Sequence, residues 1–574
     1  MDGSRETDTL TTLPYERTDA DSVKPNILIL MTGQQRFDSF RAGGAEFMYT
    51  PQLDRLAASG RLYSNAFTPV PDGMPARHNL LTGLTGKTHG CTDGNSSFAV
   101  PGWIQSCPKL LSDHGYETLS IGKNRFFPPR RHHGYDRIHL MEPHPRFREE
   151  DDYALYLKNQ GYGHILNIHG CENLLYHIPQ NPLLPEEHQG DTWIADRALD
   201  FLETNRGRHP WMMKLSWHTP HPPQSPAGRF TELYTEKELP PLRKSTTPLS
   251  HTAGSNAEQF RKIPSEWFKR YRELYYSAVS QVDYNIGRVL DCLEDTDQRR
   301  NTLIIFLSDH GDMLGDHDCM EKGLPYDSCT RIPLILSYPE KISPGEVNHD
   351  FADLNDIFPT ILDAAGIQFS YTTTKLPGES LLLDSQSGRK DRKAQYVEYG
   401  SGSRRWISLR TEDYKFNYYY REGREELFDL KNDSDESRNL LFSSQDEKVQ
   451  KVRTDLRSRL MEMERLWGPE GCLSEDDFIS LEGSSENHDT AGRYPVFQKS
   501  IKDPREQNRM NSFVDEVLQC VEKESIVDLE QLDLEKWQKE GDFSDKQVRD
   551  LLVKEKKLRS RPPAAVAGQS KQQE

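Results

Sequence analysis

Short apolar runs that each stop abruptly at polar residues constrain the fold of this 574-residue chain more than any other feature. Residues 25–31 read PNILILM and lead into TGQQR, and residues 301–307 read NTLIIFL and lead into SDHGD. Continuous apolar runs of this length are typical of strands that are buried on both faces of a parallel sheet. Runs at 116–123, 211–223 and 331–339 have a similar form, so we expect several such strands.

Between these runs lie longer segments with the periodicity of helices, at 50–60, 192–205 and 265–295. In the first of them, Thr50 is placed to cap the helix and Pro51 falls in the first turn. Strands that alternate with helices predict an α/β fold in which a large, mainly parallel sheet is sandwiched by helices.

Changes in composition divide the chain into four parts. Residues 1–23 are polar and acidic, and we expect a disordered tail there; residues 24–370 carry the strand–helix alternation. Residues 371–468 are rich in aromatic and charged side chains, which favours a smaller antiparallel α+β subdomain. Residues 469–574 predict a charged helical extension that ends in a disordered tail.

The net charge of −18 argues against nucleic acid or an anionic membrane as a partner. The longest apolar run near the start, residues 27–31, is too short to span a membrane, and no apolar signal segment precedes it. The eight cysteines lack zinc-binding spacing and are expected to be reduced thiols in a cytoplasmic protein. The sequence leaves open whether the chain forms a homo-oligomer.

Polar side chains gather where the predicted strands end. Gln34, His221, Asp309 and His310 each follow an apolar run, and the carboxyl ends of parallel strands meet at one edge of a sheet. The segment SDHGDMLGDHDCMEKG, residues 308–323, is the densest of these groups. A carboxylate next to an imidazole suits a divalent metal. An acidic surface loop is the alternative interpretation.

Seven blocks of the chain resemble the sulfatase family of the alkaline phosphatase superfamily. They occur in the family's order over about residues 24–440 and read PNILILMTGQQRFD, TPQLDRLAASG, NAFTPVPDGMPARHNLLTG, SIGKNRFFPP, LSWHTPHPP, SDHGDMLGDHDCMEKG and FADLNDIFPTILDAAGI. In style they are most similar to the choline-sulfatase and phosphonate monoester hydrolase branch. The resemblance implies hydrolysis of sulfate, phosphate or phosphonate monoesters by a formylglycine made from a cysteine or serine.

The resemblance also implies roles for individual residues. It assigns catalytic and charge-binding roles to Arg77, Lys123, His221 and Lys322, and metal ligation to Gln34, Asp309 and His310. The implied cofactor is a divalent cation, calcium or alternatively manganese, beneath the nucleophile and the ester oxygens. The implied ligand is a small anionic ester.

Two positions depart from the family pattern in a way that affects the chemistry. The nucleophile position is Gly73, which has no side chain to oxidise, and a metal-ligand position is Gly33, which weakens the cation site. A third, Arg125, stands where the family has histidine. Asp72 is the one neighbouring carboxylate that could substitute as nucleophile, and it would need a backbone shift to reach the site.

Three functions therefore remain open at this point. The chain is an impaired hydrolase that uses a substitute nucleophile or a metal-bound water, or a pseudoenzyme that binds an anionic ligand or a protein partner. The third alternative is a scaffold whose distinctive part is the C-terminal extension.

Overall fold

A computed structural model of the chain describes residues 24–481 with short gaps. The gaps are 95–97, 144, 146–147, 163–167, 170–176, 178, 180–181, 183, 249–262, 264, 373, 384–391, 443 and 445. The tail expected at 1–23 and most of the extension expected at 469–574 lie outside the described residues.

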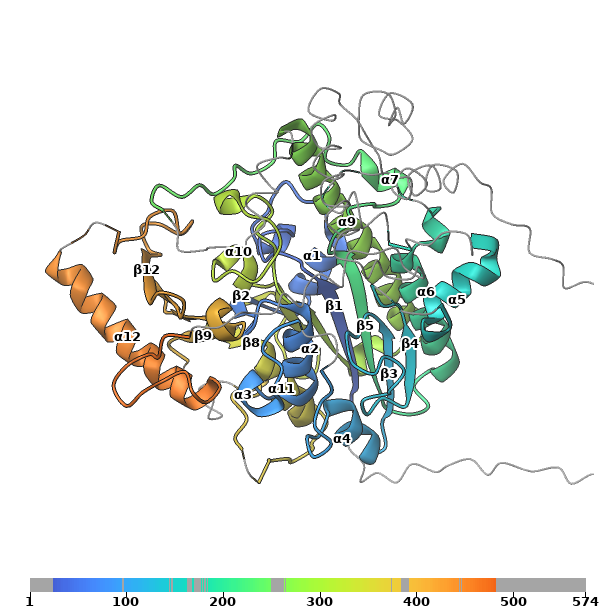
Figure 1. The fold of residues 1–574 in the computed structure, drawn as a ribbon. Helices are drawn as coiled ribbons and strands as arrows, with labels where there is room; N and C mark the ends of the chain where they lie inside the picture. The colour runs from blue at the N-terminus through green and yellow to red at the C-terminus, as the bar shows by residue number, and fades with distance from the viewer. Residues whose placement is uncertain are drawn as a thin grey trace, which may run out of the picture.

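A central sheet of eight strands has the order β4-β3-β5-β1-β6-β7-β2-β8 (Figure 1). The strands are β1 (Asn26–Gly33), β2 (Arg61–Phe67), β3 (Glu117–Gly122), β4 (Arg137–Leu140), β5 (Trp211–Pro220), β6 (Thr302–Ser308), β7 (Leu334–Ser337) and β8 (Glu346–Asp353). All neighbouring pairs are parallel except the two that β7 makes, with β6 and with β2. The mainly parallel sheet predicted from the sequence is confirmed.

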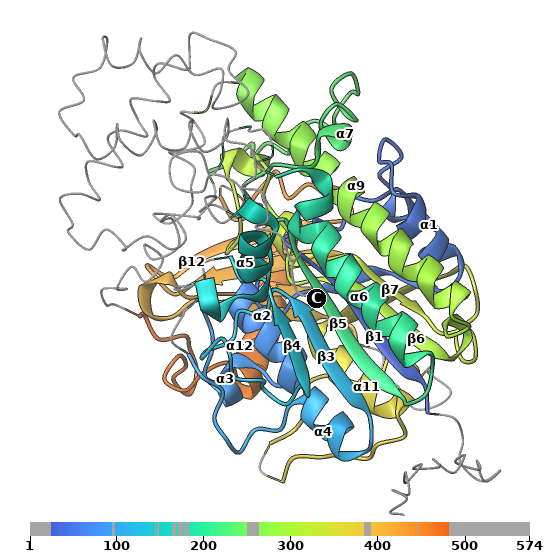
Figure 2. The ribbon, with the colours of Figure 1, turned by 90° about the vertical axis from the view of Figure 1, so that its right-hand side faces the viewer.

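Helices cover both faces of this sheet (Figures 1 and 2). The described part of the chain up to residue 364 contains α1 (Pro51–Ala58), α2 (Gly73–Thr82), α3 (Gly86–His89), α4 (Cys107–Asp113), α5 (Asp152–Leu157), α6 (Gly190–Asn205), α7 (Gly228–Thr231), α9 (Ser265–Asp295), α10 (Asp327–Thr330) and α11 (Ile357–Ala364).

The alternation of side chains along β1 creates two separate hydrophobic cores. Ile27, Ile29 and Met31 point to one face, where they join side chains of α2, α4 and α11. Leu28 and Leu30 point to the other face and pack with α1, α6 and α9. Burial on both faces explains why this strand has a continuous apolar sequence.

One detail of the helix at 50–60 differs from the prediction. The Thr50 side chain does not cap α1; its hydroxyl oxygen accepts a hydrogen bond from the Arg41 backbone at 2.9 Å. The carboxylate of Asp283, on α9, instead accepts from the backbone N–H groups of Gln52 at 3.2 Å and Leu53 at 2.7 Å. A side chain from a distant helix thus satisfies the donors that a local cap would otherwise satisfy.

A second sheet, antiparallel and four-stranded, follows the first in sequence. It has the order β12-β11-β10-β9 and consists of β9 (Gln395–Tyr399), β10 (Trp406–Arg410), β11 (Tyr414–Tyr419) and β12 (Arg424–Asp429), with α12 (Glu447–Trp467) packed against it. The indole N–H of Trp406 donates to the Gly323 carbonyl at 2.8 Å, so the second sheet braces the segment that carries Lys322. None of the helices in the described part of the chain has the length and apolar character needed to cross a membrane.

Candidate functional site

The ends of β1 and β6 bring Gln34 and Asp309 together. The two strands are parallel neighbours, with Thr32 opposite Ser308, so the residues that follow them share one edge of the sheet. The backbone N–H of Gln34 donates to Asp309 Oδ1 at 2.8 Å. The strand-end placement expected from the sequence therefore gives direct contact across 275 positions of the chain.

Arg77, on α2, forms a buried ion pair with Asp309. Its Nε and Nη2 donate to Asp309 Oδ2 at 3.1 and 2.9 Å, and the two side chains are 1% and 0% exposed. Its Nη1 donates to Ser216 Oγ at 2.6 Å and to the Lys123 carbonyl at 2.8 Å. The guanidinium therefore has three partners, and it links α2 to β5 and to the ends of β3 and β6.

Both carboxylate oxygens of Asp309 are fully used. Oδ1 accepts the backbone N–H groups of Gln34 and of His310, the latter at 3.0 Å, and Oδ2 accepts two from Arg77. A carboxylate has about four acceptor positions, and here protein donors occupy four. Burial raises the pKa of Asp309, but neighbouring positive charges and these hydrogen bonds outweigh it and hold the pKa well below its usual range.

Gly73 is the first residue of α2 and faces the Asp309–His310 pair. A Cβ built on Gly73 would lie 3.3 Å from Asp309 Oδ2 and 3.7 Å from His310 Nε2. The position that the motif predicts for the nucleophile is therefore directed at the predicted metal ligands. Asp72 caps the same helix, since its carboxylate accepts from the Met74 backbone at 3.3 Å. Its use as a cap disfavours Asp72 as a substitute nucleophile.

His310 presents an unprotonated nitrogen toward this space. Its Nδ1 lies 2.8 Å from the Gly311 carbonyl, so Nδ1 carries the proton and Nε2 carries the lone pair. Burial lowers the pKa of His310 to about 4, which keeps the ring neutral at pH 7.

Two lysines and two histidines form the other wall of the site. Lys123 Nζ lies 3.3 Å from His218 Nδ1, the His218 and His221 rings are 4.4 Å apart, and His221 Nε2 lies 3.3 Å from Lys322 Nζ. Lys322 Nζ in turn donates to Gln34 Oε1 at 3.3 Å. The structure thus brings all eight residues predicted from the sequence into one connected group: Gln34, Gly73, Arg77, Lys123, His221, Asp309, His310 and Lys322.

His218 is a member of this wall that the sequence analysis did not single out. It lies three positions before His221 in WHTPHPP, and β5 ends between them. Its Nε2 donates to the Pro222 carbonyl at 3.1 Å, which leaves Nδ1 to accept from Lys123. The paired histidines in this segment were the available signal, and only the second was assigned a role.

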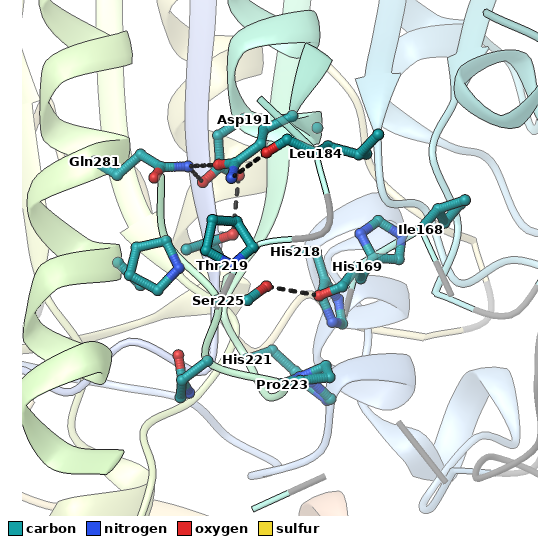
Figure 3. A pocket seen from close by; sticks show the side chains of 16 residues that line it. Ile168, His169, Leu184, Asp191, His218, Thr219, His221, Pro223, Ser225 and Gln281 are labelled. Carbon is teal, nitrogen blue, oxygen red and sulfur yellow. Dashed lines mark hydrogen bonds between the residues drawn. The ribbon is translucent and has the colours of Figure 1, made fainter. Parts of the chain in front are cut away.

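A small cavity of about 50 Å³ opens beside the two histidines (Figure 3). At one side of it Asp191 accepts hydrogen bonds from Thr219 Oγ1 and Gln281 Nε2, each at 2.9 Å. Burial raises the pKa of Asp191 to about 7. The carboxyl group of Asp191 is therefore only partly ionised at neutral pH.

Gly33 is a point of close contact between β1 and β5. The register of these strands shifts between Met31 and Gly33, and a Cβ on Gly33 would lie only 2.6 Å from the backbone carbonyl oxygen of His218. A backbone atom cannot move aside as a flexible side chain can. No side chain fits at position 33 unless the end of β5 shifts.

The donors present do not fit a calcium ion. Calcium takes six to eight oxygen ligands, whereas the residues implied as ligands are Asp309, whose oxygens are fully used, the imidazole of His310, and the amide of Gln34. The Gln34 amide oxygen faces an ammonium group, and its nitrogen donates to Asp312 at 2.5 Å. Among the described residues, no cluster of three or more histidine, cysteine or acidic side chains could hold a metal.

Comparison with known proteins shows which family this chain resembles. A family model described as Sulfatase matches residues 25–367, and one for the C-terminal part of N-sulphoglucosamine sulphohydrolase matches residues 315–465. An arylsulfatase of Clostridium perfringens is 29% identical over 449 residues, which cover 74% of this chain and 91% of that protein. A choline-sulfatase of Rhizobium meliloti is 27% identical over 431 residues, 73% of this chain and 82% of its own.

A solved structure gives the same fold. The phosphonate monoester hydrolase of Agrobacterium radiobacter superposes with a TM-score of 0.65 at 21% identity, over 80% of this chain and 100% of that protein. The relatives therefore include a choline-sulfatase and a phosphonate monoester hydrolase, the two kinds of protein that the sequence motifs resemble most.

Proposed function

The chain belongs to the sulfatase family, and from this premise we propose that it binds a sulfate or phosphate-type monoester in the cleft without hydrolysing it by the family's formylglycine route. The observation that carries the proposal is the glycine at position 73. A Cβ at this position would point toward Asp309 and His310, as the nucleophile of the family is expected to do, but glycine has no side chain. The basic side chains that would hold an anion are nevertheless present around it.

The charges of the site support an anionic ligand. Lys123 is 3% exposed, and no carboxylate in the described part of the chain lies within ion-pair distance of its Nζ. Lys322 lies 3.5 Å from Glu321 and also contacts His221. A buried ammonium group without a carboxylate is costly unless an anion accompanies it. A sulfate or phosphate group supplies that charge and accepts hydrogen bonds from both lysines.

An aryl sulfate should bind to the protein without release of the phenol. We expect saturable binding of p-nitrophenyl sulfate by isothermal titration calorimetry and no p-nitrophenolate above the uncatalysed rate. Lys322→Gln should weaken binding roughly 10- to 100-fold, because a hydrogen bond to a charged group contributes about 1.5–3 kcal/mol.

The matched control is Lys109→Gln, which changes an exposed lysine that pairs with Asp113 on the same helix and should leave binding unchanged. Absence of binding to aryl sulfate, aryl phosphate and phosphonate monoesters alike would contradict the proposed function. Rapid release of p-nitrophenol by the unmodified protein would favour a hydrolase with a substitute nucleophile.

Binding of the anion should be coupled to proton uptake. Burial lowers the pKa of Lys123 and of His221, and nearby positive charges lower both further: Arg77 acts on Lys123, and the two lysines act on His221. The negative charge of a bound ester opposes these effects and raises both pKa values, so the complex holds more protons than the free protein. Affinity should therefore fall as pH rises between the free-state and bound-state pKa values.

Calorimetry in two buffers of different ionisation enthalpy, Tris and HEPES, measures the number of protons taken up. Lys123→Met should reduce that number as well as the affinity. A binding enthalpy that is identical in both buffers across this range of pH would show that neither group changes its protonation.

A further inference from the structure

Resting on the proposed anion-binding function, we infer that this site binds its ligand without a divalent cation. Positively charged side chains of the protein lie where a metal ion would supply charge. The backbone of β5 occupies the space that an acidic side chain at position 33 would need. Three independent features of the site lead to this inference.

The first is the saturation of Asp309. Arg77 donates two hydrogen bonds to Oδ2 and two backbone N–H groups donate to Oδ1, all between 2.8 and 3.1 Å. A cation that bound this carboxylate would have to displace the Arg77 guanidinium, which is itself fixed by Ser216 and the Lys123 carbonyl. The guanidinium of Arg77 already balances the negative charge of Asp309.

The second is the environment of Gln34. Its Oε1 accepts from Lys322 Nζ at 3.3 Å. A calcium ion bound to that oxygen at about 2.4 Å would lie within about 6 Å of the ammonium group and of its positive charge. Repulsion at that separation is substantial in a partly buried site. The amide oxygen is thus already matched to a cation that the chain itself supplies.

The third is the closure of β1 on β5 at Gly33. A carboxylate there would have to begin from a Cβ only 2.6 Å from the His218 carbonyl oxygen. The close approach removes the space from which a second acidic ligand would extend. It also positions His218 and, through it, the ammonium of Lys123.

We therefore expect Lys123, Lys322 and His221 to contact the ligand. Arg77 is committed to Asp309 and acts as a positioning residue for the site. An oxyanion that accepts from both lysines and from the imidazolium of His221 has its charge balanced by the protein alone.

Calorimetry and thermal unfolding of the full chain test this inference directly. We expect no saturable heat when CaCl₂ or MnCl₂ is titrated into protein treated with EDTA. The apparent Tm should be the same in EDTA and in millimolar Ca²⁺. Binding of p-nitrophenyl sulfate should change less than twofold between EDTA and Ca²⁺.

Metal binding at this site would contradict the inference. Saturable Ca²⁺ or Mn²⁺ binding that Asp309→Asn abolishes would overturn the inference, as would aryl sulfate binding that requires the metal. Because Asp309 is buried, Gln34→Ala provides a second variant that removes an implied ligand while leaving the carboxylate in place. Asp318→Asn, at an exposed residue paired with Lys244, is the control for weak surface binding.

The two proposals fail separately. If no ester or inorganic anion binds under any condition, the proposed function is wrong, and the metal titration alone still decides whether the site holds a cation.

Discussion

Replacing Arg77 by methionine is expected to destabilise the protein by about 3–5 kcal/mol, the cost of removing one partner from a buried ion pair. The substitution leaves the Asp309 carboxylate fully buried with two backbone donors and no cation in contact. It also leaves Ser216 Oγ and the Lys123 carbonyl without the guanidinium. The shift in the urea midpoint of unfolding, followed by fluorescence, measures the effect.

Arg55→Met is the matched control. Arg55 pairs with Asp291 at 2.8 Å, but both side chains are about half exposed, so its loss should cost no more than about 1 kcal/mol. In the double variant Arg77→Met with Asp309→Asn, the unpaired charge is gone and part of the stability should return. If Arg77→Met and Arg55→Met lowered the free energy of unfolding equally, the buried Arg77–Asp309 pair would contribute no more to stability than an exposed pair does.

The cost of Arg77→Met should depend on pH. In the wild-type protein the pKa of Asp309 is depressed, so the stability it contributes is present above the unfolded value of about 3.9 and is lost as pH falls through the folded value. Without Arg77, burial has less opposition and the pKa rises. The penalty is then largest at pH 7 and shrinks as the carboxyl is protonated at lower pH.

The second large effect concerns turnover. The wild-type protein should hydrolyse aryl sulfates roughly six orders of magnitude more slowly than an intact enzyme, the loss that removing a catalytic nucleophile typically causes. Gly73→Cys, coexpressed with a formylglycine-generating enzyme, supplies a nucleophile precursor. Its Cβ contact of 3.3 Å with Asp309 Oδ2 requires only a small adjustment. The variant should recover little activity, because the carboxylate missing at position 33 is still absent.

Gly33→Asp should recover less, and should also destabilise the fold. Its Cβ overlaps the His218 carbonyl at 2.6 Å, and relief of such overlap by backbone movement costs about 1–3 kcal/mol. Because groups that act as one catalytic unit are non-additive, the double variant should exceed the sum of the single variants if it folds. Gly102→Cys and Gly102→Asp are controls at an exposed glycine where a Cβ meets nothing within 4 Å.

Strong metal-dependent hydrolysis by the unmodified protein would refute this account. It would point to Asp72 or to a metal-bound water as the attacking group, and loss of that activity in Asp309→Ala would place it in this cleft.

The strands that the sequence predicted are those buried on both faces. β1 and β6 lie in the middle of the sheet, so every position is buried and each strand contains five consecutive apolar residues that are easily recognised. β4 and β8 form the two edges of the sheet and carry exposed polar residues, which removes that signal. The antiparallel direction of β7 was not predictable from its composition, because a short buried strand has the same apolar sequence in either direction.

Most members of the site were predictable, whereas His218 and the contacts within the site were not. Strand ends and motif positions indicated Arg77, Asp309 and Lys322, since each follows from the fold or from the family resemblance. The saturation of Asp309, the contact between Lys322 and Gln34, and the overlap at Gly33 depend on distances of a few tenths of an ångström. Such distances are set by packing between segments far apart in the chain, and no local pattern encodes them.

The close approach of β1 and β5 at Gly33 sets the order in which substitutions could place a carboxylate here. An acidic side chain at position 33 would require the end of β5 to lie farther from β1 than it does in this structure. With β5 in its present position, the Cβ of any residue that replaces Gly33 meets the His218 carbonyl oxygen at 2.6 Å, so the first effect of the substitution is destabilisation. A variant that carries a carboxylate at position 33 therefore needs a compensating change at the end of β5 before the new side chain can fit.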